Sequence, residues 1–287
     1  MHTTPHLRLA TLALLGLSAL LLTACQPAEP RAASLDTEAL LKLRFDKPDE
    51  PQDLDVSDLE ENKNPNPAER TVLRATVAPL QLVRLDENHA LLLTDVRSGE
   101  DCHACPGVLG AYAYARDERG WRLAHSQDAV LSYGGYGRLG ALKVHTVAPG
   151  RQTATLEWGS CWQGVCGSWL QVLGLQATGV RVLGESLPVA LDNDGMHEAC
   201  ARLDGKARQE PAAPDAPAEP LEHQECRQIE GDWRFEGGRL RIDFSGRERL
   251  VENGVLLPVR RISQRAVYEL QPATLQLVEG ENPVTGF

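Results

Sequence analysis

The sequence predicts a mainly β fold, organised as an antiparallel meander, sandwich or open barrel, with a short helix or a tether at its N-terminal end. Three observations support this prediction. Short apolar or alternating runs, bounded by Gly, Pro, Asp and Asn, recur from residue 71 onward. Helical periodicity is scarcely visible between residues 71 and 190. The 287 residues are 42% apolar but only 5% aromatic, so Leu, Val and Ala must supply most of a substantial core.

The first element in chain order is a leader at residues 1–24. Arg8 precedes the apolar run Leu9–Leu22, which is shorter than the roughly 20 residues that a membrane-spanning helix needs. A charged start, a short apolar run and small residues before a cut are typical of a secretory signal peptide. A short transmembrane anchor is the alternative interpretation.

The leader ends in Leu22-Thr23-Ala24-Cys25, which resembles the lipobox of bacterial lipoproteins. This resemblance implies that Cys25 is diacylated, for example with palmitate, and becomes the mature N-terminus. Stable anchoring by acyl chains needs more than one chain. Because Gln26 rather than Asp follows the cysteine, the resemblance also implies an outer-membrane lipoprotein that faces the periplasm. A chance cysteine at the end of a signal peptide is the alternative.

Residues 25–70 are expected to form an acidic tether, since they hold 12 acids against 6 bases. Like charges repel one another and extend a chain. One short helix could interrupt the tether, with Ser34 as its N-cap. The apolar residues that recur near helical spacing there are Leu35, Leu40, Leu41 and Phe45.

The β-rich domain is expected to span residues 71–287. Its strands are predicted where apolar runs lie between turn residues. The predicted strands are Thr71–Val77, Leu80–Leu85, Ala90–Thr94, Val108–Ala115, Leu142–Val147, Thr153–Trp158, Trp169–Leu175, Val180–Leu183, Trp233–Phe235, Leu240–Phe244, Val255–Val259, Ala266–Leu270 and Thr274–Val278.

One segment, residues 204–222, lacks this strand pattern. Proline recurs there at every third position from Pro211 to Pro220, with only Ala, Asp and Glu between. This composition favours polyproline II and cannot form a core, so we expect a surface excursion between two halves of the domain. A ligand for a proline-binding module is the alternative.

Six cysteines remain beyond Cys25, and an even number in an exported protein predicts disulfides. Six cysteines allow 15 pairings, and the sequence does not choose among them. We favour the sequence-local set, in which the last pair would close the Pro-rich excursion at its base. These disulfide candidates are Cys102 with Cys105, Cys161 with Cys166, and Cys200 with Cys226.

The segment Cys102-His103-Ala104-Cys105 has three interpretations: a structural disulfide, a redox-active dithiol, or half of a zinc site completed by Cys161 and Cys166. A haem-attachment site is excluded because Pro106, not His, follows the second cysteine. A redox dithiol would place its first cysteine at a helix N-terminus, but the residues after Pro106 are strand-like. We therefore favour the structural disulfide and predict no metal site.

The segment Gly135-Tyr136-Gly137-Arg138-Leu139-Gly140 matches the dinucleotide-binding pattern G-x-G-x-x-G. That interpretation requires a helix next, whereas the following residues are strand-like, so a flexible loop between strands is favoured. The scattered histidines, including His103 and His145, are expected to be surface or packed residues. The five tryptophans are expected to be core residues, with an exposed contact residue as the alternative for Trp162, which lies between two cysteines. We predict no catalytic residues, no cofactor and no enzymatic activity.

The formal net charge of −11 argues against nucleic-acid binding, because such a chain has little to neutralise phosphates. A basic envelope protein or peptide would be an electrostatically suitable partner. The oligomeric state is not predicted.

The Cys102–Cys105 segment, the Gly120-Trp121 turn and the Trp-Gln-Gly loop at 162–164 together resemble uncharacterised bacterial envelope lipoproteins with a C-H-x-C segment. The tail 277–283 fits the same resemblance, which covers residues 85–287. No activity is assigned to that family, so it supplies no catalytic residues. We therefore expect a lipid-anchored envelope protein with a non-catalytic binding or structural role. The alternative is a thiol–disulfide or metal-handling protein that acts through Cys102 and Cys105.

Overall fold

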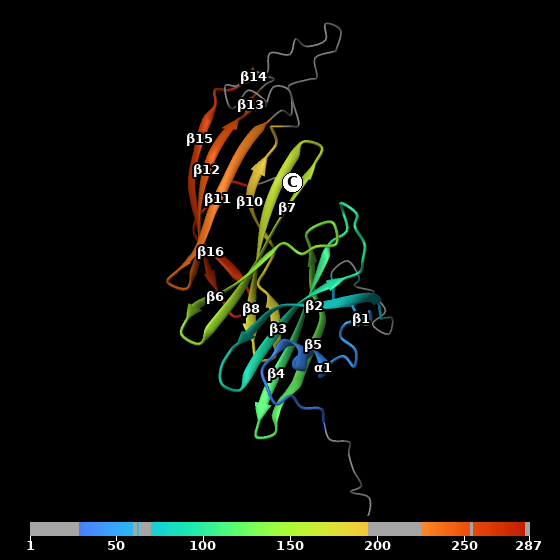
Figure 1. The fold of residues 1–287 in the computed structure, drawn as a ribbon. Helices are drawn as coiled ribbons and strands as arrows, with labels where there is room; N and C mark the ends of the chain where they lie inside the picture. Colours follow the sequence, from blue (N-terminus) through green and yellow to red (C-terminus); the bar gives the residue numbers. More distant parts are fainter. Residues whose placement is uncertain (1–28, 60–61, 63–69, 195–224, 253–254, 285–287) are drawn as a thin grey trace, which may run out of the picture.

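The computed structural model describes residues 29–59, 62, 70–194, 225–252 and 255–284 (Figure 1). Within these residues the chain is built almost entirely of antiparallel strands, with one short helix, which confirms the predicted mainly β fold. Cys25, Cys200 and the predicted Pro-rich excursion lie outside the described residues. In the described part, no helix is long and apolar enough to span a bilayer.

The first sheet is a five-stranded meander in which each strand pairs with the next strand in the chain. Successive antiparallel strands joined by short turns need no crossover, so sequence neighbours become neighbours in space. Its strands are β1 (Gln52–Asp55), β2 (Val72–Arg84), β3 (His89–Arg97), β4 (Gly107–Asp117) and β5 (Gly120–Tyr133).

The second sheet has nine strands in the order β16-β15-β12-β11-β10-β8-β7-β6, and β9 pairs with β8 beside this path. A separate two-stranded ribbon, β13 (Val251–Glu252) with β14 (Val255–Leu256), completes the described strands. The strands of the second sheet are β6 (Ala141–Ala148), β7 (Arg151–Trp162), β8 (Val165–Gln176), β9 (Gly179–Val182), β10 (Leu187–Asp192), β11 (Cys226–Glu236), β12 (Arg239–Arg249), β15 (Arg260–Leu270) and β16 (Leu275–Gly280).

The nine-stranded sheet curls so that strands distant in its order meet. The ring of His145 on β6 lies 4.9 Å from that of Phe235 on β11, although three strands separate them in the sheet. The indole Nε1 of Trp233 on β11 donates to Glu157 on β7 at 3.1 Å. One apolar cluster therefore fills the concave side, with members from β8, β10, β11, β12 and β15.

Both faces of the first sheet are covered. Leu91, Leu93 and Leu109 on one face pack with Leu156 and Leu173 of the second sheet in a shared apolar cluster. The other face packs against the N-terminal segment, including the helix α1 (Thr37–Lys42). Because both faces are buried, β3 and β4 are buried over nearly their whole lengths rather than alternating.

The expectation of a tether at residues 25–70 is corrected over its described part. Leu40, Leu41 and Phe45 are buried against the first sheet, and β1 adds a strand to it. The acidic side chains of Asp46 and Glu50 lie exposed around this apolar minority. The charge count therefore describes the outer surface of the segment, whereas the helical spacing of its leucines predicts where it packs.

The expected short helix is present, but its N-cap is Asp36 rather than Ser34. The Asp36 carboxylate accepts a hydrogen bond from the backbone N–H of Ala39 at 2.9 Å, as an N-cap should. The hydroxyl of Ser34 donates to the same carboxylate, which lowers the pKa of Asp36. Asp36 therefore satisfies the helix terminus, and Ser34 supports the cap.

A buried carboxylate fastens the N-terminal segment to the first sheet. Asp128 on β5 is 8% exposed at its side chain and forms an ion pair with Arg44 at 2.9 Å. The Tyr112 hydroxyl donates to Asp128 at 3.3 Å, and the backbone N–H of Asp55 donates to it at 3.2 Å. This network joins β1, β4 and β5 to Arg44, the second residue after α1.

Several strands differ from their predicted bounds. Residues 71–77 and 80–85 were expected as two strands but form the single strand β2, which continues through a bulge between Pro79 and Gln81. Strands β5 and β10 were not predicted, because β5 carries many polar side chains and β10 contains Pro188. The expected strand Val255–Val259 is limited to the two residues of β14.

Candidate binding groove at two disulfide loops

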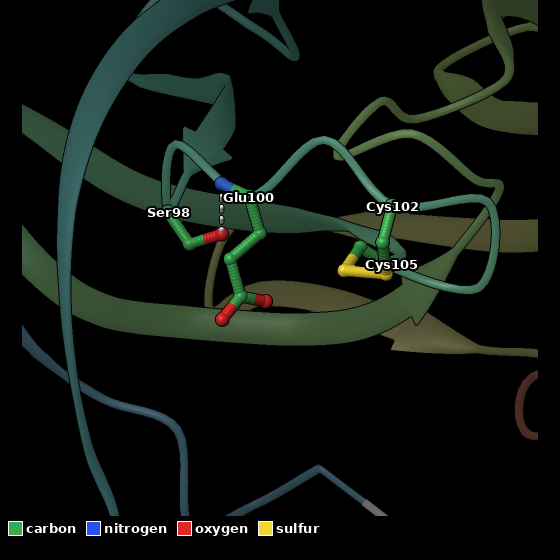
Figure 2. Close-up of a disulfide and its surroundings, with 4 residues drawn as sticks. All are labelled: Ser98, Glu100, Cys102 and Cys105. Carbon is green, nitrogen blue, oxygen red and sulfur yellow. Dashed lines mark hydrogen bonds between the residues drawn. A yellow bond between two sulfur atoms is a disulfide. The ribbon is translucent and has the colours of Figure 1, made fainter.

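The loop between β3 and β4 is closed by the Cys102–Cys105 disulfide, whose Cα atoms are 5.0 Å apart (Figure 2). The backbone N–H of Cys105 also donates to the Cys102 carbonyl at 3.0 Å, so the four residues form a tight turn. Before this turn, the N–H of Glu100 donates to the Ser98 hydroxyl at 3.3 Å. The side chain of His103 is exposed at the tip of the turn.

The glycine-rich loop between β5 and β6 docks on this turn. The N–H of Tyr136 donates to the Cys102 carbonyl at 3.0 Å, and the N–H of Gly137 donates to the Cys105 carbonyl at 2.8 Å. Gly137 has a φ of +65°, and a Cβ on it would lie 2.2 Å from the Glu100 carbonyl oxygen. This glycine is therefore required for close approach between two backbones.

No helix follows the glycine-rich loop, since the chain enters β6 at Ala141. This excludes a dinucleotide-binding motif of the type that needs a helix N-terminus for the pyrophosphate. The expectation of a flexible loop does not explain why the loop has glycine at these positions, where other backbone atoms approach closely. Gly140 shows the same constraint as Gly137, because its Cβ would lie 1.9 Å from the Glu157 carbonyl oxygen on β7.

The second disulfide, Cys161–Cys166, joins β7 and β8 directly across their ladder. The two residues between Trp162 and Val165 are Gln163 and Gly164, which both have positive φ, at 49° and 85°. This conformation suits a two-residue hairpin turn, whose twist matches that of the flanking strands. The turn leaves Trp162 exposed by 67%, so the alternative of an exposed residue holds for Trp162 rather than the expectation of a core residue.

The two disulfide loops meet through aromatic rings. The imidazole of His103 lies 5.3 Å from the ring of Tyr136 and 5.8 Å from that of Trp162, measured between centroids. Tyr136 is 54% exposed. Three rings from three loops, β3–β4, β5–β6 and β7–β8, thus form one exposed cluster, which we call the aromatic cluster.

An open groove of about 590 Å³ lies beside the aromatic cluster. Its floor is supported by stacked rings, since Tyr133 stacks on Trp158 at 4.0 Å and Trp158 on Trp169 at 6.1 Å. Stacked aromatic pairs add about 0.5–1.5 kcal/mol to the effect of area burial, so these contacts stabilise the groove residue Trp158 in its position. Residues lining the groove include His103, Tyr136, Arg138, Glu157, Gly159 and Cys161.

The groove and the two loops beside it show neither the metal site nor the helix-terminal dithiol considered for Cys102 and Cys105 from the sequence. The four cysteines of the two loops form one disulfide in each loop, so they do not form the four-cysteine zinc site considered from the sequence. Among the described residues, no group of three or more His, Cys, Asp or Glu side chains could hold a metal ion. The chain after Pro106 enters β4, so no helix dipole is available to stabilise a Cys102 thiolate.

A second polar groove, of about 460 Å³, lies on the concave side of the large sheet and shares Glu157 with the first. His145 lines it and accepts or donates a hydrogen bond at Thr155 Oγ1, 2.9 Å from its Nε2. Burial, followed by the nearby Lys143 ammonium, lowers the pKa of His145 below 6.5. His145 is thus a packed residue, as predicted.

The remaining predicted residues are placed as follows. Cys226, at the start of β11, is buried and disulfide-bonded, while its predicted partner Cys200 lies outside the described residues. Cys25 also lies outside them. Sequence reasoning missed Tyr136, because the glycines around it drew attention to the backbone. It also missed Trp158 as the centre of a ring stack, because the partner Tyr133 lies on the unpredicted strand β5.

No family model, curated protein or solved structure matches this chain.

Proposed function

We propose that this protein is a lipid-anchored envelope protein, held at a membrane through Cys25 and facing the periplasm, with a non-catalytic binding role. The observation that supports binding is the aromatic cluster of His103, Tyr136 and Trp162 beside an open groove. Exposed apolar patches on a protein surface often mark sites of interaction. Aromatic residues are enriched at such sites.

The rigidity of the cluster also supports a binding role. Each of its rings extends from a tight turn, and two of these turns are closed by disulfides. A surface that is held in place before binding loses less conformational entropy when a partner arrives. We infer that the disulfides contribute to affinity by keeping the three loops in register.

The proposed partner is a basic envelope protein or peptide rather than a nucleic acid. The formal charge of the chain is −11, and acidic side chains at Glu100 and Asp101 are exposed beside the Cys102–Cys105 turn. Opposite charge on the partner would accelerate association and suppress unsuitable partners.

Two measurements test the proposal. Metabolic fatty-acid labelling should be lost on Cys25→Ser, and labelling that persists would refute the anchor. Quantitative affinity capture from envelope extract should then compare the wild type, Trp162→Ala and Leu277→Ala. Leu277 on β16 is 44% exposed and lies outside the groove, so its variant is a matched control for loss of an exposed apolar side chain. Partners lost on Trp162→Ala alone support the groove, whereas equal recovery from all three proteins would refute it.

A thiol–disulfide function through Cys102 and Cys105 is a second candidate, favoured by the exposure of Cys102 on the tip of its loop. It predicts that the purified protein, with its Cys102–Cys105 disulfide intact, oxidises a dithiol test substrate or, after reduction, reduces a disulfide test substrate. The binding proposal predicts no such exchange, so this assay separates the two.

A further inference from the structure

The feature that carries a further inference is the free edge of β7 beyond the end of β6. The last pair between these strands joins Ala141 to Glu157, whereas β7 continues to Trp162 and pairs with β8 throughout. Figure 1 shows the β7–β8 hairpin extending past β6. Within the described part of the chain, no strand pairs with Gly159–Trp162 on the side away from β8.

The register shows which backbone groups point outward at this edge. Cys161 and Cys166 face each other with their Cα atoms 4.0 Å apart, the close spacing of a non-hydrogen-bonded pair. In such a pair the N–H and C=O groups point away from the partner strand. Because the pattern alternates, Gly159 and Glu157 share this outward direction with Cys161. The Glu157 carbonyl indeed faces the incoming chain at Gly140.

Gly159 and Cys161 both line the open groove and are exposed, so a ligand can reach this edge. The edge also lacks the usual protection against strand pairing: its residues are Gly159, Ser160, Cys161 and Trp162, without proline, lysine or any charge. A glycine within a strand often marks a site that another backbone approaches closely.

We propose that this edge, Gly159–Trp162 of β7, receives an extended peptide segment of a partner protein as an added antiparallel or parallel strand. This inference rests on the proposed binding function and names the class of its ligand. Main-chain hydrogen bonds to Gly159 and Cys161 supply affinity, and side-chain contacts with the aromatic cluster supply selectivity.

Charge determines the chemistry of the peptide. Glu100 and Asp101 are exposed on the loop beside the groove, whereas the groove lining holds one acid, Glu157, whose carboxylate accepts from Trp233, and one base, Arg138. The bound segment is therefore basic overall. It carries no proline at the positions that donate to β7, because proline has no N–H. Its alternate side chains face the aromatic cluster, since side chains alternate along a strand.

The test uses the purified full-length protein in detergent micelles and random peptides displayed on phage. Selected peptides are synthesised in two series, each with N-methyl groups at alternate backbone positions. One series lacks the N–H donors that face β7, and the other series, shifted by one residue, lacks the N–H donors that face away from it. The first series should weaken binding about two- to tenfold per methylated position, and the series shifted by one residue should not, because a lost hydrogen bond of ordinary strength has about that effect.

Two protein measurements locate the site. Amide hydrogen exchange at Gly159 and Cys161 should slow on binding. The variant Gly159→Pro should abolish binding while the protein stays folded, because proline is tolerated at an edge position whose N–H faces solvent. Leu277→Ala should bind normally. The methylated peptides test the same edge without altering the protein, so a misfolded Gly159→Pro variant would not remove the test.

The inference is overturned if the selection returns no peptide, if both methylated series bind equally, or if exchange slows at the opposite edge strand β16 instead. Binding of a soluble glycan in place of any peptide would also overturn it. None of these assays depends on acylation of Cys25 or on capture from envelope extract. Their failure, with capture that still depends on Trp162, would remove strand addition and leave the proposed function standing.

Discussion

The close contact between the glycine-rich loop and the Cys102–Cys105 turn predicts a difference between two glycine-to-alanine variants. Gly137 and Gly150 have nearly the same positive φ, at 65° and 69°. Alanine therefore meets the same backbone strain at both positions, roughly 1–2 kcal/mol. They differ in surroundings, because a Cβ on Gly150 meets no atom within 4 Å, whereas one on Gly137 would lie 2.2 Å from the Glu100 carbonyl oxygen.

The expected magnitudes follow from these contacts. Gly150→Ala should lower the free energy of unfolding by about 1–2 kcal/mol through strain alone. Gly137→Ala must also push the two turns apart, which breaks the hydrogen bonds from Tyr136 and Gly137 to the cysteine carbonyls. Each such bond contributes about 0.5–1.5 kcal/mol, so the total loss should be about 2–5 kcal/mol.

Urea unfolding, followed by tryptophan fluorescence, measures both variants on the same day and in the same buffer. The account also expects Gly137→Ala to reduce partner capture, since Tyr136 moves with the loop, and Gly150→Ala to leave it unchanged. Equal losses of stability would refute the reasoning, because they would show that the glycine-rich loop does not depend on close approach to the disulfide turn.

Three further predictions address the disulfide, the buried ion pair and the packed histidine. The double change Cys102→Ala with Cys105→Ala should cost about 2 kcal/mol by loop-closure entropy, and the reduction potential of the native pair should lie below about −300 mV. A potential near −200 mV would contradict a structural disulfide. Asp128→Ala should cost about 2–3 kcal/mol in urea unfolding, since its partners are left unsatisfied. Asp243→Ala, on the exposed face of β12, should cost less. Hydrogen bonds from Arg265 and then Arg241 lower the Asp243 pKa, so the difference of that variant from the wild type should shrink as pH falls below 3.8. NMR titration of His145 should give a pKa below 6.5. Protonation of His145 then favours the unfolded state, so stability should fall as pH drops below 6.5, and His145→Gln should remove that part of the fall.

The sequence predicts the strand-rich body well where burial is simple. The runs at β3, β4 and β12 are apolar enough to be recognised without knowing their partners. β5 escapes prediction because it lies between two clusters and presents polar residues such as Gln127 and Asp128 to specific partners. Its pattern becomes interpretable only when those partners are known.

The N-terminal segment shows a different limit. Its acid count predicts an extended chain, yet a few apolar residues at helical spacing are sufficient to pack it on the first sheet. Asp128, which receives Arg44 from this segment, is 84 residues away in the chain. The residues next to Arg44 or Asp128 in the sequence therefore give no indication that the two side chains form an ion pair.

The groove shows the third limit. The local pairing of its cysteines could be predicted, because the two cysteines of each pair are close in sequence. The meeting of His103, Tyr136 and Trp162 could not, because it depends on three loops from two sheets. The glycine-rich motif could be interpreted only as a flexible loop, because the backbone that approaches Gly137 belongs to the loop between β3 and β4 and gives no signal near the motif in the sequence.

The central claim is that the aromatic cluster is the surface through which this protein binds its partner. Photo-crosslinking in intact cells tests it most directly. A photoreactive phenylalanine analogue is placed at Tyr136, which is 54% exposed in the cluster, or at Leu277, which is 44% exposed on β16. The account predicts a discrete crosslinked adduct from position 136 and not from position 277. The same adducts from both positions, or none from position 136, would contradict it.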